Sequence, residues 1–205
     1  MKKLFIILDN GHGNDTPGKR SPDGRIMEWS YTRDIARKVQ ERLNEIGIEN
    51  HILVPEDNDV PLGNKNSHID CRVKRANEII RTKKLQGYES LLISIHLNAA
   101  GNSGWSNASG FSTWVAPNAG DKSKLFASIC EKEAIDKGLK GNRSVPKDHF
   151  WVGNFAIIRE TSCPAVLLEC LFQDNMEDVE YLFSDKGKET IADIIVNSII
   201  KYATV

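Results

Sequence analysis

The sequence predicts an α/β fold in which a mostly parallel sheet is covered by helices on both faces. Short runs of continuous apolar residues, such as Leu4–Leu8 and Leu91–Ile95, are typical of strands that are buried on both sides. These runs alternate with segments whose apolar residues recur at helical spacing, which favours a parallel sheet. The 205 residues contain no internal repeat and no linker rich in Ser and Pro, so we expect one domain over residues 1–205.

The elements follow in chain order from apolar periodicity and from turn residues. The first half predicts a strand at Leu4–Leu8, a loop over residues 11–25, a helix from about Ser30 to Gly47, a strand at His51–Pro55, a loop at Glu56–Ser67, a helix around Val73–Ile80 and a strand at Leu91–Ile95. The second half predicts a loop at Asn98–Ser109, a strand at Phe111–Val115, a helix at Lys122–Lys137, a loop at Gly141–Gly153, strands at Phe155–Arg159 and Ala165–Glu169, and a last helix through Ile191–Ile199.

Composition argues against several classes of protein. Lys and Arg total 27 against 28 Asp and Glu, so the net charge of −1 leaves no basic surplus for nucleic acid. No segment approaches the ~20 apolar residues of a membrane span. The run at Leu4–Leu8 is shorter than the ~7–15 residues of a signal-peptide core. We expect a monomer that binds no nucleic acid and has neither a membrane span nor an export signal.

Three polar residues stand where three predicted strands end. His12 follows the first strand, His96 follows Leu91–Ile95, and Glu169 closes the strand that begins at Ala165. Ligands of open α/β sheets bind outside the carboxyl ends of the strands. The topology alone therefore predicts a functional site that contains these three side chains.

Glu28 lies between the glycine-rich loop and the first predicted helix, and such a loop can fold back over the strand ends. Two histidines and one glutamate, here His12, His96 and Glu28, match the ligand set of hydrolytic zinc sites, which leave a fourth position for water. Such a Zn²⁺ ion lowers the pKa of its water toward about 7 and polarises a carbonyl. Glu169 would then take a proton from the attacking water and pass it to the leaving nitrogen.

Each of these residues also has a simpler interpretation. His12 is compatible with a plain Gly-His-Gly turn, His96 with a core histidine, and Glu28 with an acid favoured by the dipole of a first helical turn. Glu169 is harder to explain structurally, because a carboxylate directly after an apolar run is costly to bury unless it is paired or lies near a metal. The four residues together favour the zinc site.

Five further residues are candidates for contact with a substrate: Asn98, Trp105, His149, Trp151 and Arg159. The amide of Asn98 is suited to orient His96 or to shape the cleft, the Arg159 guanidinium to bind a carboxylate of the substrate, and the indoles to stack on sugar or peptide. Surface packing, or pairing of Arg159 with a nearby acid, explains the same residues equally well. The basic residues Arg72, Lys74 and Arg75 are expected on the solvated face of the second helix.

Seven segments, each weak alone, form a specific set in this order: Leu8–Gly13, Met27–Trp29, Ser94–Ala99, Ser109–Trp114, Asn142–Arg143, Phe155–Thr161 and Cys163–Glu169. With this order and spacing the chain resembles, nearly from end to end, the zinc-dependent N-acetylmuramoyl-L-alanine amidases of the Amidase_3 type. One departure is Leu171, which stands where the family often has Gly.

The resemblance implies that His12, Glu28 and His96 bind zinc and that Glu169 is the catalytic glutamate. It also implies the substrate, peptidoglycan, and the bond, which is the amide between the lactyl group of N-acetylmuramic acid and L-alanine. The fold that it implies, a twisted mixed sheet flanked by helices, agrees with the prediction above.

We recognise neither a wall-binding module nor a leader in the chain. This fits a phage endolysin, or an exported enzyme given without its leader. Two alternatives stay open. A zinc peptidase or amidohydrolase that acts on soluble peptides would use the same ligands. A non-catalytic wall-binding module would not need Glu169.

Overall fold

The computed structural model describes residues 3–55, 68–101 and 104–205. The predicted loop at 56–67 lies outside the described residues. In chain order the elements are β1 (Lys3–Asn10), α1 (Glu28–Glu45), β2 (Glu49–Ile52), α2 (His68–Leu85), β3 (Tyr88–Asn98), β4 (Ser112–Val115), α3 (Asp121–Asp136), β5 (Trp151–Val152), α4 (Ala156–Arg159), β6 (Ala165–Phe172), α5 (Met176–Phe183) and α6 (Asp185–Ala203).

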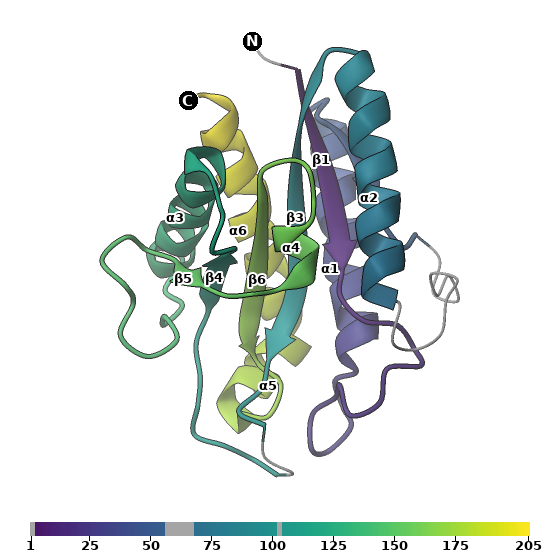
Figure 1. Cartoon of the computed structure of the whole chain (residues 1–205). Coiled ribbons are helices and arrows are strands. Elements are labelled where there is room, and N and C mark those ends of the chain that lie inside the picture. The colour runs from purple at the N-terminus through teal and green to yellow at the C-terminus, as the bar shows by residue number, and fades with distance from the viewer. Residues whose placement is uncertain (1–2, 56–67, 102–103) are drawn as a thin grey trace.

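The strands of the described residues form one 6-stranded sheet in the order β2-β1-β3-β6-β4-β5. β1 pairs in parallel with β2 and β3, and β3 pairs in parallel with β6. β4 runs antiparallel to β6, and the short β5 is parallel to β4. The predicted mixed, mostly parallel sheet is confirmed, and β1, β3 and β6 end at the same edge (Figure 1).

Helices cover both faces of the sheet. α1, α3 and α6 pack on one face, and α2 with the short α4 packs on the other (Figure 1). Alternate side chains of β1 enter opposite cores: Ile6 and Leu8 pack with α1 and α6, whereas Phe5 and Ile7 pack with α2. Burial on both faces explains the continuous apolar run of this strand. None of the described helices is both long and apolar enough to cross a bilayer.

The predicted strand at Phe155–Arg159 is wrong, because these residues form the helix α4. The Phe155 carbonyl accepts hydrogen bonds from the backbone N–H groups of Ile158 (3.2 Å) and Arg159 (3.0 Å). Strand β6, which follows, already has β3 and β4 on its two sides, so the sheet offers no place for another strand beside it. Ile157 and Ile158, whose apolar character suggested a strand, are buried in the core on the α2 face.

Two short elements differ from the sequence prediction in another way. β5 lies at the end of the predicted loop Gly141–Gly153, and no element was predicted where α5 follows β6. Asn175 caps α5, because its side-chain oxygen accepts a hydrogen bond from the backbone N–H of Asp178 (3.0 Å). Both elements are too short for apolar periodicity to reveal them.

The expectation that Arg72 is solvated is wrong. Arg72 is only 5% exposed, and its Nη1 lies 2.6 Å from Oδ1 of Asp9 on β1. The same guanidinium donates to the carbonyls of Asn10 (2.9 Å) and His12 (2.6 Å). Burial raises the pKa of Asp9, but the adjacent Arg72 and further hydrogen bonds outweigh burial and lower it. Arg72 therefore ties α2 to the end of β1, whereas Lys74 is exposed as expected.

The pairing of β3 with β6 changes register near the carboxyl ends. His96 pairs with Glu169, but Asn98 pairs with Phe172, so β6 carries one extra residue between these pairs. Within it, Leu171 has a φ of 72°. This left-handed conformation costs an L-residue about 1–2 kcal/mol but is easy for Gly. The Gly that the resemblance leads us to expect at this position would adopt this conformation without that cost.

Substitutions at Leu171 separate backbone strain from packing. Leu171→Ala and Leu171→Gly both remove a side chain that is 4% exposed, so both should lower the free energy of unfolding by about 2–5 kcal/mol. Because only Gly relieves the left-handed backbone, we expect Leu171→Gly to be more stable than Leu171→Ala by about 0.5–1 kcal/mol in urea unfolding.

Leu167, on the same strand, provides the control. It is 3% exposed and has no positive φ. The Leu167→Ala variant should be more stable than Leu167→Gly by about 0.5–1 kcal/mol, which is the usual order inside a strand. The same ranking of Ala and Gly at both positions would contradict the assignment of strain to Leu171.

Candidate metal centre

His12 lies two residues beyond the end of β1, in a left-handed backbone conformation that is strained for most residues other than Gly. Its φ is 61°, and such strain costs about 1–3 kcal/mol and persists only where surrounding contacts hold it. The guanidinium groups of Arg33 and Arg72 donate to the His12 carbonyl over 3.3 and 2.6 Å. Both arginines are buried. The backbone of His12 is therefore fixed from α1 and α2 together.

Gly11 allows the His96 ring to pack against the end of β1. A Cβ at Gly11 would lie 2.3–2.6 Å from three atoms of that ring, so a larger residue would displace the ring. The Gly11 N–H donates to the carbonyl of Ile95 (3.0 Å), and the Thr32 hydroxyl donates to the Gly11 carbonyl (3.0 Å). The rings of His12 and His96 consequently meet edge to face, with their centroids 4.9 Å apart.

The long loop after β1 brings Glu28 to these rings by folding into a hairpin. Arg20 and Met27 form an antiparallel bridge, and the backbone N–H of Glu28 donates to the Lys19 carbonyl over 3.0 Å. Gly24, with a φ of 73°, lies within the turn of this hairpin. Glu28 is the first residue of α1, where the partial positive charge of the helix start favours a carboxylate.

The Glu28 carboxylate is fully buried among polar partners. Its Oε1 lies 3.3 Å from Nε2 of His12 and 3.1 Å from Nδ1 of His96, and it accepts a hydrogen bond from the Leu97 N–H (2.9 Å). Its Oε2 accepts from Nε2 of Gln173 (3.0 Å). Burial alone would raise the pKa of Glu28, but the hydrogen bonds to the two histidines outweigh burial and lower the pKa strongly. The carboxylate is therefore ionised.

The three side chains suit a zinc ion. One ligand atom from each of His12, Glu28 and His96 lies within 4.8 Å of the others. Tetrahedral zinc with metal–ligand distances of about 2.0–2.1 Å separates its ligand atoms by about 3.3 Å. The measured separations from Glu28 Oε1, 3.3 and 3.1 Å, agree with this spacing. The two imidazoles and one carboxylate are also the donors that hydrolytic zinc sites use.

Glu169 lies one strand away from these ligands. It pairs with His96 across β3 and β6, and, two residues after Leu167, it lies on the same face of the sheet, which is the α2 face. Its Oε2 atom is buried and has no hydrogen-bond partner among the described residues. Burial raises the pKa of Glu169 to about 7. A carboxyl group with these properties is suited to general acid–base chemistry near neutral pH.

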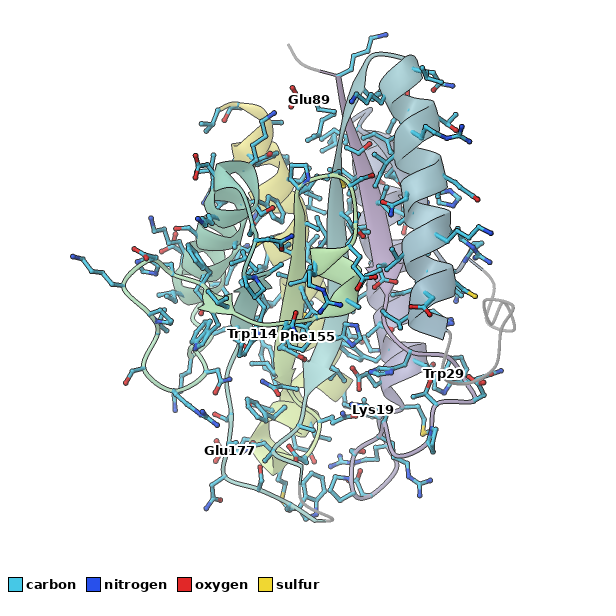
Figure 2. The ribbon with its side chains drawn as sticks, in the orientation of Figure 1. Lys19, Trp29, Glu89, Trp114, Phe155 and Glu177 are labelled. Carbon is cyan, nitrogen blue, oxygen red and sulfur yellow. The ribbon has the colours of Figure 1, made fainter. Side chains whose placement is uncertain are left out.

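Two of the five residues expected to contact substrate lie on strands of the sheet, Asn98 on β3 and Trp151 on the edge strand β5. Asn98 ends β3, and its carbonyl accepts a hydrogen bond from the Gln173 N–H (2.8 Å). Trp151 lies on β5, with its ring 6.1 Å from that of Trp114 on β4. Figure 2 shows Trp114 and Phe155 next to each other in front of the sheet, and their ring centroids are 5.6 Å apart.

Of the other three residues, Trp105 and His149 lie on loops, and Arg159 is the last residue of α4. Trp105 is partly exposed in the loop before β4. His149 has a φ of 59° and a buried Nδ1 without a partner among the described residues. Arg159 pairs with Glu160 and lines a separate hollow beside Pro164, at the start of β6. The structure therefore does not bring Arg159 to His12, Glu28 and His96, and its contact with substrate stays a prediction.

Sequence reasoning missed Gln173, which holds the second oxygen of Glu28. Gln173 directly follows β6, so its position after a strand end is the same signal that identified His12 and His96. The extra residue in β6 breaks the alternation that would have placed it on the site's face. Arg33 was missed for a different reason: a basic residue on a helix gives no sign that its guanidinium is buried.

Comparison with known proteins finds relatives over nearly the whole chain. The family model for N-acetylmuramoyl-L-alanine amidase matches residues 6–201. The protein named probable cell wall amidase LytH of Staphylococcus epidermidis is 26% identical over 205 residues, which cover 98% of this chain. The germination-specific N-acetylmuramoyl-L-alanine amidase of Bacillus subtilis is 24% identical over 206 residues, and this match also covers 98% of the present chain. The chain spans 59% of the length of the staphylococcal protein and 80% of that from B. subtilis.

Solved structures extend the comparison to the fold. The catalytic domain of CwlV, an N-acetylmuramoyl-L-alanine amidase from Bacillus (Paenibacillus) polymyxa var. colistinus, superposes with a TM-score of 0.76 at 27% identity over 98% of each chain. An N-acetylmuramoyl-L-alanine amidase from Clostridium difficile 630 shares the fold, with a TM-score of 0.77 at 24% identity over 100% of this chain and 98% of that one. Since the family model spans almost the whole sequence, the chain belongs to the N-acetylmuramoyl-L-alanine amidase family.

Proposed function

We propose that the chain is a zinc-dependent peptidoglycan amidase that hydrolyses the amide between the lactyl group of N-acetylmuramic acid and the L-alanine of the stem peptide. The observation that carries this proposal is the convergence of His12, Glu28 and His96 beside a buried Glu169 oxygen that has no partner among the described residues. Membership of the family supports the choice of bond. We further propose that the protein acts as a monomer, after release like a phage lysin or after export.

When bound by the three ligands, zinc supplies a Lewis acid that polarises the scissile carbonyl and acidifies a water. Oε2 of Glu169 accepts the proton of the attacking water and, with a pKa of about 7, gives it up to the leaving nitrogen of L-alanine. Gln173 and the Leu97 N–H each hold one oxygen of Glu28, so the orientation of this ligand is fixed before substrate arrives.

The proposed activity is tested on purified cell wall. The protein should lower the turbidity of a cell-wall suspension. A chelator should abolish this activity and stoichiometric zinc should restore it, because the proposed hydrolysis requires the metal. Product analysis should show new L-alanine N-termini on released stem peptides. Cleavage between amino acids would instead indicate a peptidase, and co-sedimentation with the wall without released products would indicate a binding module. Either result would overturn the proposal.

Replacing the catalytic carboxyl should separate chemistry from metal binding. Glu169→Gln keeps the shape of the side chain but removes the proton acceptor, so we expect the rate of wall cleavage to fall about 10²–10⁴-fold. Zinc affinity, measured by competition with a chromogenic chelator, should stay at the wild-type value. Retention of full cleavage by this variant would show that Glu169 does not move the proton.

Gly11 should be required for zinc binding. In Gly11→Ala the new Cβ would collide with the His96 ring, and the displaced ring should weaken zinc binding about 10–100-fold, as loss of a supporting contact does. Gly104→Ala is the matched control, because a Cβ there meets no atom within 4 Å and the φ is not positive. Equal zinc affinity of the two variants would contradict the role given to Gly11.

A further inference from the structure

A hollow of about 380 Å³ opens beside the metal ligands. Its walls are the loop over residues 17–22 on one side and Ala99, Gly101, Gln173 and Asp174 on the other. Gln173 connects the hollow to the metal centre, because its Nε2 donates to Oε2 of Glu28. Lys19 provides a second connection, since its carbonyl accepts a hydrogen bond from the Glu28 N–H (3.0 Å). The hollow is therefore linked to Glu28, and so to the proposed metal centre, through residues of both its walls.

Two buried side chains of this hollow each have an oxygen atom with no hydrogen-bond partner in the part of the chain that the structure describes. Gln173 is 2% exposed and Asp174 is 4% exposed. Gln173 commits its Nε2 to Glu28, which leaves Oε1 as the unpartnered acceptor among the described residues. Asp174 uses Oδ2 to accept from the Ala100 N–H (2.8 Å), and its Oδ1 likewise lacks a partner among the described residues. Because unsatisfied buried acceptors are costly, the pair indicates a ligand that brings N–H donors.

The facing wall carries positive charge. Lys19 and Arg20 both line the hollow, so a ligand that fits it carries carboxylates as well as N–H donors. A peptide has both groups. Beyond Glu169, β4 and β5 instead carry the rings of Trp114 and Trp151, which are suited to stack on a sugar. Figure 2 shows Lys19 and Trp114 on different sides of the centre of the sheet.

We propose that this hollow is the subsite for the stem peptide beyond its L-alanine. Gln173 Oε1 and Asp174 Oδ1 accept hydrogen bonds from peptide N–H groups, and Lys19 and Arg20 bind a peptide carboxylate. The proposal rests on the amidase function for the identity of the substrate. It also gives the substrate a direction, with the peptide toward residues 17–22 and the glycan toward β4 and β5.

Asp174→Asn tests the subsite with little change of shape. The amide oxygen of Asn keeps the hydrogen bond from Ala100, so its NH₂ group takes the place of Oδ1 and a donor then faces the peptide N–H. We expect the Kd of the zinc-loaded protein for the synthetic peptide L-Ala-γ-D-Glu-L-Lys, measured by calorimetry, to rise about tenfold or more. KM for a muramyl tripeptide should rise likewise, with the effect on KM rather than on kcat.

Two further variants make the test specific. Lys19→Gln, on the opposite wall, should weaken binding of the same peptide but not of its fully amidated form, since only the former offers carboxylates. Glu177→Gln makes the same carboxylate-to-amide change as Asp174→Asn at an exposed position of α5 outside the hollow, and it should leave the Kd unchanged.

The outcomes separate the subsite from the function. If wall cleavage depends on zinc but Asp174→Asn and Lys19→Gln bind the peptide as the wild type does, the subsite is wrong and the amidase function stands. If these variants weaken peptide binding while no muramyl amide is cut by any form, the subsite stands and the proposed function fails. Loss of binding in Glu177→Gln as well would also overturn the subsite, because the effect would then follow net charge alone.

Discussion

The buried carboxylate of Glu28 is the interaction on which the rest of the site depends. An ionised carboxylate without water costs several kcal/mol unless its oxygens are fully paired, and here the partners come from three separate segments. His12 follows β1, His96 and the Leu97 N–H belong to β3, and Gln173 follows β6. The carboxylate is therefore stable only where the ends of the three central strands meet, and it in turn fixes the start of α1 above them.

The sequence predicted the parts of this arrangement that follow from local pattern. Strands buried on both faces are apolar throughout, so β1 and β3 were recognised, and with them His12 and His96 at their ends. Glu28 was proposed from the ligand set, but the path of the loop that carries it could not be predicted, because its hairpin depends on the pairing of Arg20 with Met27 and on backbone bonds that no periodicity encodes.

The wrong predictions concern residues whose structure is decided by neighbours that are distant in the chain, which local pattern does not reveal. Residues Phe155–Arg159 have the composition of a strand, but β6 has no free side to accept one, so they coil into α4. Arg72 is charged, as residues on solvated helix faces usually are, but it is buried because it forms an ion pair with Asp9 on β1. In both cases tertiary context overrides the intrinsic preference of the segment.

The bulge in β6 shows how strand geometry and site chemistry constrain each other. Regular alternation after Glu169 would turn Cys170 toward the α1 face and Leu171 toward the α2 face. The extra residue instead lets both enter the core on the α1 face, at the expense of a left-handed backbone at Leu171. The strand then resumes with the Gln173 N–H bonded to the Asn98 carbonyl, which sets Gln173 within reach of Glu28.

The orientation of the Gln173 amide joins metal binding to recognition of the peptide. If the amide were reversed, its oxygen would face Oε2 of an ionised carboxylate, and two acceptors cannot bond to each other. The charge of Glu28 therefore directs Nε2 of Gln173 toward the Glu28 carboxylate and leaves Oε1 as the remaining acceptor of the amide. A glutamate at position 173 would repel the Glu28 carboxylate, and an apolar residue there would leave Oε2 of Glu28 without its hydrogen-bond donor. The hydrogen-bonding character of the proposed peptide subsite is consequently a product of the metal centre itself and does not vary independently of it.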